Sequence, residues 1–329
     1  MTKAISTILG GALFLTAAAT AAQAGGLERG GYNWDLLFDA QRFATEAGVV
    51  YVMPHRKFKN AVDIKPADGI GSDGLGGGKT SGDLTEPYAV PRFGVKVGLT
   101  PDVDCLASYS QPWGADSKPG ADWIGAQNEI QTQIRSNDYG LTCSYKFHAG
   151  KGTLRTLGGI SYQEIEGFKE RLLSAAAQAS GLSGNGRTSL AGHGIGWRAG
   201  AAYEIPEMAL RASLIYNAPV DIDLDGKLDT SGVGLGITDI YGKIAMPQSV
   251  ELKLQSGIAP GWLAFGSVKW VDWSTLDVVT ICPSALKGQA CSPTQNRATS
   301  LDLMYQDGWT VMGGIGHKFN DKWSGAVQV

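Results

Sequence analysis

The feature that most constrains the fold is an alternation of apolar and polar residues that recurs from about residue 88 to the end of the chain. In residues 92–99 the apolar members fall at every second position, as Phe93, Val95, Val97 and Leu99. A period of two places successive side chains on opposite faces of a β-strand. The sequence therefore predicts an all-β fold whose strands have one apolar and one polar face.

The length and spacing of these segments favour a membrane over water, although a soluble sandwich also alternates. The segments run about 9 to 15 residues, which matches a tilted membrane-spanning strand. Tight turns such as Pro101-Asp102 alternate with long connections such as 114–135, 165–190 and 219–246. Since no segment after residue 24 holds about 18 consecutive apolar residues, helices cannot provide the span. We predict a transmembrane antiparallel β-barrel.

About eleven strands are expected, with boundaries uncertain by several residues. They fall near residues 47–58, 88–99, 104–113, 136–148, 152–164, 191–205, 208–218, 248–258, 262–276, 300–319 and 322–329. The last segment still alternates at Val329, and bacterial single-chain barrels have an even number of strands. We therefore expect the barrel to be incomplete at its C-terminus.

The N-terminal region divides into two parts. Lys3, an apolar run from Ile5 to Ala19 and the sequence Ala22-Gln23-Ala24 predict a signal peptide over residues 1–24, with an uncleaved anchor as the alternative. Residues 25–46 form an apolar-rich, plug-like segment before the barrel of residues 47–329. An ordinary lead-in to the first strand is the alternative for this segment.

Charge and cysteine content restrict the partners and the compartment. The formal net charge is −3, from 28 Lys and Arg against 31 Asp and Glu, so nucleic acid is not an expected partner. Cys282 and Cys291 bracket a short loop, and Cys105 and Cys143 fall on neighbouring predicted strands. Both pairs fit disulfides in an oxidising compartment, whereas buried thiols stay an alternative for the second pair.

Sequence elements in the C-terminal third resemble a known family. They are Met246-Pro247-Gln248-Ser249-Val250-Glu251-Leu252, Trp262, Trp270-Val271-Asp272-Trp273-Ser274, Tyr305-Gln306-Asp307-Gly308-Trp309, Gly313-Gly314 and Asn320-Asp321-Lys322-Trp323. In this order and spacing they resemble the outer-membrane long-chain fatty acid transporter family (FadL-like, TodX-like). The resemblance implies a barrel of about 14 strands with an N-terminal plug in the Gram-negative outer membrane.

The resemblance also implies a function. Members take hydrophobic compounds from outside, bind them passively and release them through a lateral opening in the wall. We expect a monomer embedded in outer-membrane lipid, with hydrophobic small molecules, above all long-chain fatty acids, as its partners. A general diffusion porin and a surface adhesin or structural barrel are the alternatives.

Five basic residues on the predicted polar face are candidates for binding a fatty acid carboxylate: Arg92, Lys96, Arg198, Arg211 and Lys253. A fatty acid needs one or two cations beside an apolar cavity, because it carries one carboxylate on a long tail. The alternative is that these cations are paired with carboxylates such as Glu204 or Glu251. The sequence does not distinguish among the five.

Two long loops show apolar residues at helical spacing. They include Trp123 and Ile130 in the second loop and Leu172 and Leu173 in the third. We expect helices that either pack on each other and cap the barrel, or form an exposed apolar groove that collects substrate. The four residues are candidate substrate contacts on the second interpretation.

Motifs for other chemistries are weak. Gly69-x-Gly71-x-x-Gly74 matches a dinucleotide pattern but follows no strand, so we interpret it as a loop. Asp221-Ile222-Asp223-Leu224-Asp225-Gly226 begins like a calcium loop, but the twelfth position is Gly232, so a solvated strand extension above the membrane is preferred. The four histidines lack ligand spacing, and we expect no cofactor, no metal site and no enzymatic activity.

Overall fold

The computed structural model describes residues 15–18, 26–62, 78–320 and 322–329. Most of the predicted signal peptide and the Gly69–Gly74 pattern lie outside these residues. Within the predicted signal peptide, Leu15–Ala18 form strand β1, which pairs in parallel with the last strand, β19.

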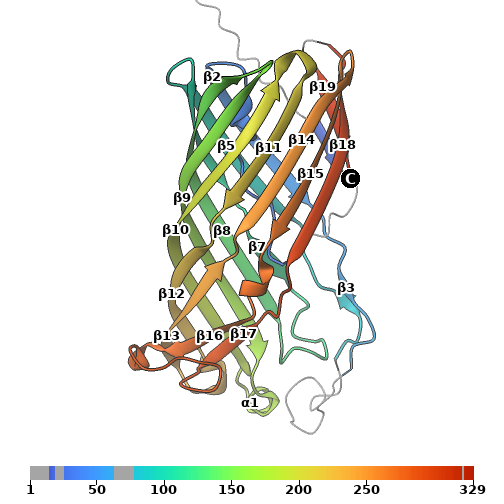
Figure 1. Cartoon of the computed structure of the whole chain (residues 1–329). Helices are drawn as coiled ribbons and strands as arrows, with labels where there is room; N and C mark the ends of the chain where they lie inside the picture. Colours follow the sequence, from blue (N-terminus) through green and yellow to red (C-terminus); the bar gives the residue numbers. More distant parts are fainter. Residues whose placement is uncertain (1–14, 19–25, 63–77, 321) are drawn as a thin grey trace, which may run out of the picture.

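One large sheet forms a wall that curls around a central lumen (Figure 1). Besides β1, its strands are β2 (Phe43–Val52), β5 (Tyr88–Gly98), β6 (Val103–Ser110), β7 (Gly114–Ser117), β8 (Gln131–Ala149), β9 (Gly152–Leu172), β10 (Asn185–Ile205), β11 (Leu210–Asn217), β12 (Val220–Asp229), β13 (Ile237–Met246), β14 (Ser249–Ala259), β15 (Trp262–Val271), β16 (Val278–Pro283), β17 (Thr299–Asp302), β18 (Gly308–Lys318) and β19 (Ser324–Gln328). A separate hairpin joins β3 (Lys57–Phe58) to β4 (Gly82–Asp83). This confirms the predicted all-β fold.

Apart from the parallel pair of β1 with β19, neighbouring strands in the wall are antiparallel, and they follow the chain in the order β2, β5, β6, β8, β9, β10, β11, β14, β15, β18 and β19. Several wall strands are interrupted once and continue as a second strand, for example β6 into β7 and β11 into β12. Three of these interruptions contain Pro112, Pro219 and Pro247, because proline has no N–H to donate within a sheet. The loop predicted over 219–246 was wrong in extent, since most of it forms β12 and β13.

The two faces of the wall differ as the alternation predicts. Along β9, Leu154, Ile160 and Tyr162 point outward and are exposed, whereas Arg155 and Gln163 point into the lumen and are buried. On β12 the polarity is reversed: Val220, Ile222 and Leu224 are buried on the lumen side, and three aspartates point outward. The segment that begins like a calcium loop is therefore a strand, as predicted, and its position above the membrane stays a prediction.

The helices are short. They are η1 (Asp35–Phe38), α1 (Ala175–Ala179), η4 (Pro206–Met208), η5 (Ser231–Val233), η6 (Trp273–Thr275) and η7 (Ser284–Leu286). The prediction of helices in the second and third long loops was therefore wrong apart from α1, because β8 and β9 extend into these loops and pair with each other up to Gln131 and Glu170. Within the described ranges, no helix is long and apolar enough to cross a membrane.

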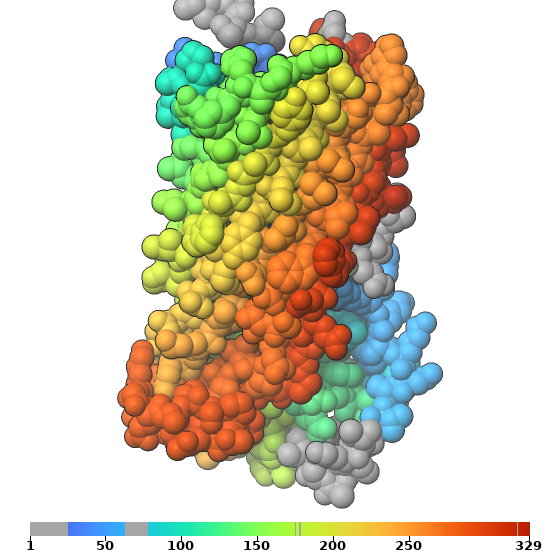
Figure 2. Space-filling view, in the orientation of Figure 1, coloured from blue at the N-terminus to red at the C-terminus, as the bar shows by residue number. Residues whose placement is uncertain are grey.

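The two ends of the wall differ in their connections. Tight turns join the strands at the upper end in Figure 1, and the long loops with α1 lie at the lower end. Figure 2 shows the wall strands packed side by side, with the residues near 280–297 gathered at the long-loop end.

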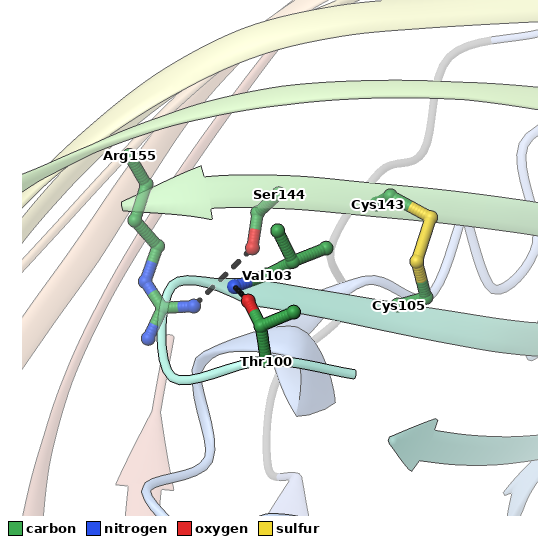
Figure 3. The surroundings of a disulfide bond; sticks show 6 residues. All are labelled: Thr100, Val103, Cys105, Cys143, Ser144 and Arg155. Atoms are coloured by element: carbon green, nitrogen blue, oxygen red, sulfur yellow. Dashed lines mark hydrogen bonds between the residues drawn. A yellow bond between two sulfur atoms is a disulfide. The ribbon is translucent and has the colours of Figure 1, made fainter. Parts of the chain in front are cut away.

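Both cysteine pairs form disulfides. Cys105–Cys143 joins the adjacent strands β6 and β8, and Cys282–Cys291 closes the short loop. Figure 3 shows the first bridge and, further along β8, Ser144, toward which Arg155 reaches from the next strand.

Candidate functional site

The N-terminal segment, residues 26–42, lies inside the lumen and packs against the wall. Trp34, Leu37 and Phe38 are buried there in a cluster with wall residues such as Leu106 and Ile215. The apolar side chains of the segment are buried in the bore, where the sheet surrounds them. Residues 26–42 fall within the predicted plug-like range, and β2 begins at Phe43.

Five aromatic rings follow one another from this segment to the long-loop side of the lumen; we call them the inner aromatic row. The centroid separations are 6.2 Å for Trp34–Tyr32, 5.7 Å for Tyr32–Trp113, 5.2 Å for Trp113–Trp273 and 5.9 Å for Trp273–Tyr305. These are ordinary distances for interacting rings. The row is thus a continuous series of ring contacts from the N-terminal segment through Trp113 to Trp273 and Tyr305.

The lumen on the long-loop side of the N-terminal segment is lined by aliphatic side chains. Val220, Ile222 and Leu224 of β12 join Ile165 of β9 and Met246 of β13 in the same buried cluster as the inner aromatic row. The reversed polarity of β12 therefore gives the lumen an apolar lining in this half.

At the short-turn end the lumen is ionic, and Asp104 is its centre. The Asp104 carboxylate lies 3.1 Å from Lys96 Nζ, 2.8 Å from Lys146 Nζ and 2.8 Å from Arg155 Nη1. Arg155 also donates to the Leu37 carbonyl oxygen and pairs with Glu204. These contacts hold the end of the N-terminal segment against the wall.

Three of the five predicted cations form ion pairs with carboxylates of the protein. Lys96 is 1% exposed, and besides Asp104 it donates to the carbonyl oxygens of Asp39 and Gln41 at 2.8 and 2.7 Å. Arg198 is 3% exposed and pairs with Asp138 at 3.2 Å, while Arg92 pairs with Glu46 at 2.7 Å. For these three residues the alternative interpretation, pairing with carboxylates of the protein, describes the structure.

The other two predicted cations, Arg211 and Lys253, line one cavity of about 1040 Å³ at the short-turn end of the lumen. Arg211 donates to Gln255 Oε1 at 2.9 Å, lies 4.4 Å from the Phe38 ring centroid and, among the described residues, forms no ion pair. Lys253 pairs with Asp35 of η1 at 2.8 Å. Leu263, Phe265 and Met312 supply apolar lining. The structure therefore brings two of the five cations to an apolar cavity.

Two titratable groups of the N-terminal segment have shifted pKa values. Burial alone would raise the pKa of the Asp35 carboxyl, but the Lys253 ammonium, together with Arg211 and Arg92, holds this pKa below its ordinary value. Burial raises the pKa of the Tyr32 hydroxyl, and the nearby Asp138 adds to the increase. Asp35 is therefore ionised and Tyr32 neutral at neutral pH.

The wall has a gap where β5 and β7 diverge. β5 pairs with β6 from Phe93 to Gly98, and β7 pairs with β8; within the described ranges β5 and β7 share no ladder. Residues 27–30 fill the space, because the N–H groups of Arg29 and Gly114 donate to the carbonyls of Pro112 and Leu27 at 2.9 and 2.8 Å. We call this place the wall gap.

Arg29 closes the wall gap with its side chain. Its guanidinium lies 4.1 Å from the Tyr88 ring centroid on β5 and pairs with Asp116 on β7. Glu28 forms a second ion pair, with Lys269 of β15. These contacts attach the N-terminal segment to both sides of the wall gap, and the attachments are non-covalent.

The candidate substrate contacts of the two long loops lie near one another, but they are not on helices. Ile130 and Leu172 are buried with Ala126, and Trp123 packs on this cluster from a turn. Leu173 follows β9 and is not part of this buried cluster. Its backbone N–H donates to the Gly184 carbonyl oxygen. The structure thus supports the packing interpretation for Ile130 and Leu172, and Trp123 also contacts Phe58 at a ring separation of 4.9 Å.

Sequence reasoning missed Asp104, Arg155, Tyr32 and Trp113. Asp104 and Arg155 lie on the polar face of alternating segments, so the alternation placed them in the lumen without showing that they meet. Tyr32 and Trp113 carried no local signal, because their contact joins residues 81 positions apart in the sequence. In the part of the chain that is described, no group of three or more His, Cys, Asp and Glu side chains is arranged to hold a metal.

Comparison with known proteins gives a family match over most of the chain. The family model described as outer membrane protein transport protein (OMPP1/FadL/TodX) matches residues 16–324. No curated protein matches the sequence.

Several solved structures share the fold. A Pseudomonas aeruginosa FadL homologue is 17% identical, covering 88% of this chain and 71% of that chain with a TM-score of 0.66. The Pseudomonas putida toluene transporter TodX is 15% identical, covering 90% and 78% with a TM-score of 0.50. The Ralstonia pickettii toluene transporter TbuX is 15% identical, covering 74% and 69% with a TM-score of 0.52. At these identities the likeness shows the fold alone.

Proposed function

The chain belongs to the outer membrane protein transport protein family (OMPP1/FadL/TodX), and from this premise we propose that it takes up long-chain fatty acids. Substrate binds passively in the lumen, and residues 26–42 act as the plug. Release is lateral, through the wall gap. The similar structures include toluene transporters, so hydrocarbons are the competing substrate class.

The observation that carries the choice of fatty acid is the cavity that contains Arg211 and Lys253. Its apolar lining suits an acyl tail, whose exposure to water costs about 0.8 kcal/mol per CH₂. Arg211 has its guanidinium at this cavity with a neutral hydrogen-bond partner, Gln255. A carboxylate beside Arg211 would gain charge-assisted hydrogen bonds that a hydrocarbon cannot form.

The test compares a charged and a neutral substrate. We expect Arg211→Gln to reduce oleate uptake into proteoliposomes about tenfold, since a hydrogen bond to a charged group contributes about 1.5–3 kcal/mol. Toluene uptake through the same variant should not change. Arg92→Gln is the matched control, because Arg92 also faces the lumen but is paired with Glu46. Equal loss of both substrates, or no loss of oleate uptake, would contradict the fatty acid assignment.

Lateral release is supported by the non-covalent closure of the wall gap. Passage there would let the substrate leave the lumen past the inner aromatic row into lipid, instead of leaving through the short-turn end into water. The step exchanges one apolar environment for another, which keeps the tail out of water. The ion pair between Arg29 and Asp116 and the contact of Arg29 with Tyr88 must open for passage.

A cross-link tests lateral release. All four cysteines are in disulfides, so the pair Arg29→Cys and Asp116→Cys can be joined selectively by a short bis-maleimide. We expect the link to stop uptake of both oleate and toluene, relative to the unlinked variant. Lys57→Cys with Asp83→Cys, an exposed ion pair of the β3–β4 hairpin, is the control and should transport normally when linked. Undiminished uptake through the linked Arg29–Asp116 variant would exclude this exit.

A further inference from the structure

The outer face of the wall has two hollows that follow one another along β8, β9 and β10. We call them lower and upper with the long loops uppermost, which is the reverse of the view in Figure 1. The lower hollow, of about 500 Å³, is apolar, and includes Leu141, Ile160 and Ile195. The upper hollow, of about 690 Å³, is charged, and includes Arg135 and Arg187. Neither belongs to the lumen, because all these side chains point away from it along the strand alternation.

The lower hollow lies in the part of the wall that faces acyl chains. Its rim consists of bulky exposed side chains, with Tyr139 48% and Ile160 60% exposed. The lining also contains the small residues Ala107 and Gly140. The shape is a groove among protruding side chains, and its apolar lining matches a single hydrocarbon chain.

A row of aromatic rings marks the long-loop edge of this apolar zone; we call it the outer aromatic row. Tyr109, Tyr139 and Tyr162 follow one another at ring separations of 5.4 and 6.4 Å, and His193 continues the row at 5.4 Å from Tyr162. Aromatic girdles lie at the membrane interface, and long loops lie outside the cell. The outer aromatic row therefore lies at the level of the outer-leaflet head groups.

The upper hollow begins four residues further along the same strands. Arg135 is four residues from Tyr139 on β8, and Glu166 is four residues from Tyr162 on β9. Four residues span about 13 Å along a strand. Arg135 and Glu166 are opposite each other in the register, and Arg187 is opposite Asp229 on β12. The hollow is thus in the layer immediately outside the hydrocarbon.

Three cations line the upper hollow without an ion-pair partner among the described residues: Arg135, Arg187 and Lys227. The Arg187 guanidinium lies 3.6 Å from the Phe168 ring centroid, which holds it at the surface. Two neighbouring outward-facing lysines do have ion-pair partners, since Lys243 pairs with Asp223 and Lys287 pairs with Asp225. Two carboxylates in the lining, Glu166 and Asp229, form no ion pair among the described residues and offer acceptors to hydroxyl groups beside the cations, whereas Asp225 is paired with Lys287.

We propose that the two hollows together bind one phosphorylated glycolipid of the outer leaflet, with an acyl chain in the lower hollow and the head group in the upper one. Arginine binds phosphate through two parallel hydrogen bonds, and the adjacent carboxylates accept hydrogen bonds from sugar hydroxyls. A phospholipid without sugar would leave these carboxylates beside its phosphate with no donors. The proposal depends on the orientation of the barrel with its long loops outside, and is independent of the transported substrate.

Native mass spectrometry of the full-length protein in detergent micelles tests the proposal, with added bisphosphorylated lipid A as the probe. We expect one tightly bound lipid A, about tenfold weaker binding of dephosphorylated lipid A, and similarly weaker binding of phosphatidylglycerol. Arg135→Gln with Arg187→Gln should weaken lipid A binding about tenfold. Lys243→Gln with Lys57→Gln removes the same charge from exposed positions outside the hollow, where each lysine pairs with an aspartate, and should leave binding unchanged.

The apolar half is tested separately by Ala107→Trp, which fills the lower hollow from its floor. We expect this variant to bind lipid A several-fold more weakly and to keep the preference for the phosphorylated form. Equal affinity of the two charge variants, or phosphatidylglycerol binding as tightly as lipid A, would overturn the proposal. Oleate uptake measured on the same variants should not change, so failure of the transport assignment is distinguishable from failure of this one.

Discussion

Asp104 is the residue on which the closed lumen depends most. It is buried, and three cations from β5, β8 and β9 converge on it, two of them also holding carbonyl groups of the N-terminal segment. Removing one partner of a buried ion pair leaves the other charge uncompensated. The carboxylate therefore stabilises both the wall and the plug.

We expect Asp104→Asn to lower the free energy of unfolding by about 3–5 kcal/mol, because Lys96 would lose its only carboxylate among the described residues. Urea unfolding in lipid vesicles, followed by tryptophan fluorescence, measures the change. Asp102→Asn is the control, since this side chain lies in the adjacent turn and carries none of these contacts. A loss below about 1 kcal/mol would contradict the role given to Asp104.

The ion pair of Asp35 with Lys253 predicts a pH dependence. The pKa of Asp35 is lowered from 3.8, so its ionised form stabilises the closed segment at higher pH, and this contribution is lost as pH falls through the lowered value. We expect bilayer conductance to be constant from pH 7 to about pH 5 and to rise only below pH 3.8.

The variant Asp35→Asn checks this assignment, because it should show the higher conductance at every pH and no acid step from this group. Asp39→Asn is the control: its carboxylate accepts the Gln41 N–H but forms no ion pair among the described residues. An unchanged acid step in Asp35→Asn would show that another group controls it.

At the scale of elements, the two disulfides differ in the length of chain they close. Cys105 and Cys143 are 38 residues apart, and Cys282 and Cys291 are 9 apart. Loop entropy then assigns about 4 kcal/mol to the first and about 2.6 kcal/mol to the second.

We therefore expect the double Cys→Ser variant of the first pair to destabilise the barrel by about 1 kcal/mol more than that of the second. The urea midpoint in vesicles, with both variants compared with the unmodified protein, measures the difference. A larger loss for Cys282→Ser with Cys291→Ser would contradict the loop-entropy account.

At the scale of the whole molecule, the composition of the outer face determines whether the folded protein is stable in water or in lipid. Side chains such as Phe93, Leu141, Ile160, Ile195 and Val311 are between 51 and 76% exposed. Contiguous apolar surface on this scale is not stable in water. The wall therefore requires lipid or detergent around it.

We expect the folded protein to stay monodisperse in detergent and to aggregate when detergent is removed, as measured by size-exclusion chromatography with light scattering. Transfer into lipid nanodiscs is the control and should restore a single species. A monodisperse folded protein in plain buffer would contradict the membrane assignment.

Several predictions from the sequence held because they depend on local periodicity. Phe93, Val95 and Val97 alternate with lumen-facing neighbours as expected, and the segments near 88–99 and 152–164 are strands. The helices expected around Trp123 and Leu172 were wrong, since cross-strand pairing of β8 with β9 outweighed the helical spacing. Periodicity in a short apolar segment does not settle its structure when a neighbouring strand can pair with it.

The sequence by itself determined the all-β architecture, the two-faced strands and, through its resemblance, the family, because each depends on residue types at fixed spacing. Only the tertiary structure decided which cations are available: Lys96 and Arg198 are paired in the lumen, while Arg211 lies at a cavity. It also decided that Arg29 fills the wall gap between Tyr88 and Asp116. These contacts join residues far apart in the chain, and the curvature and register of the whole sheet bring them together, which no local pattern encodes.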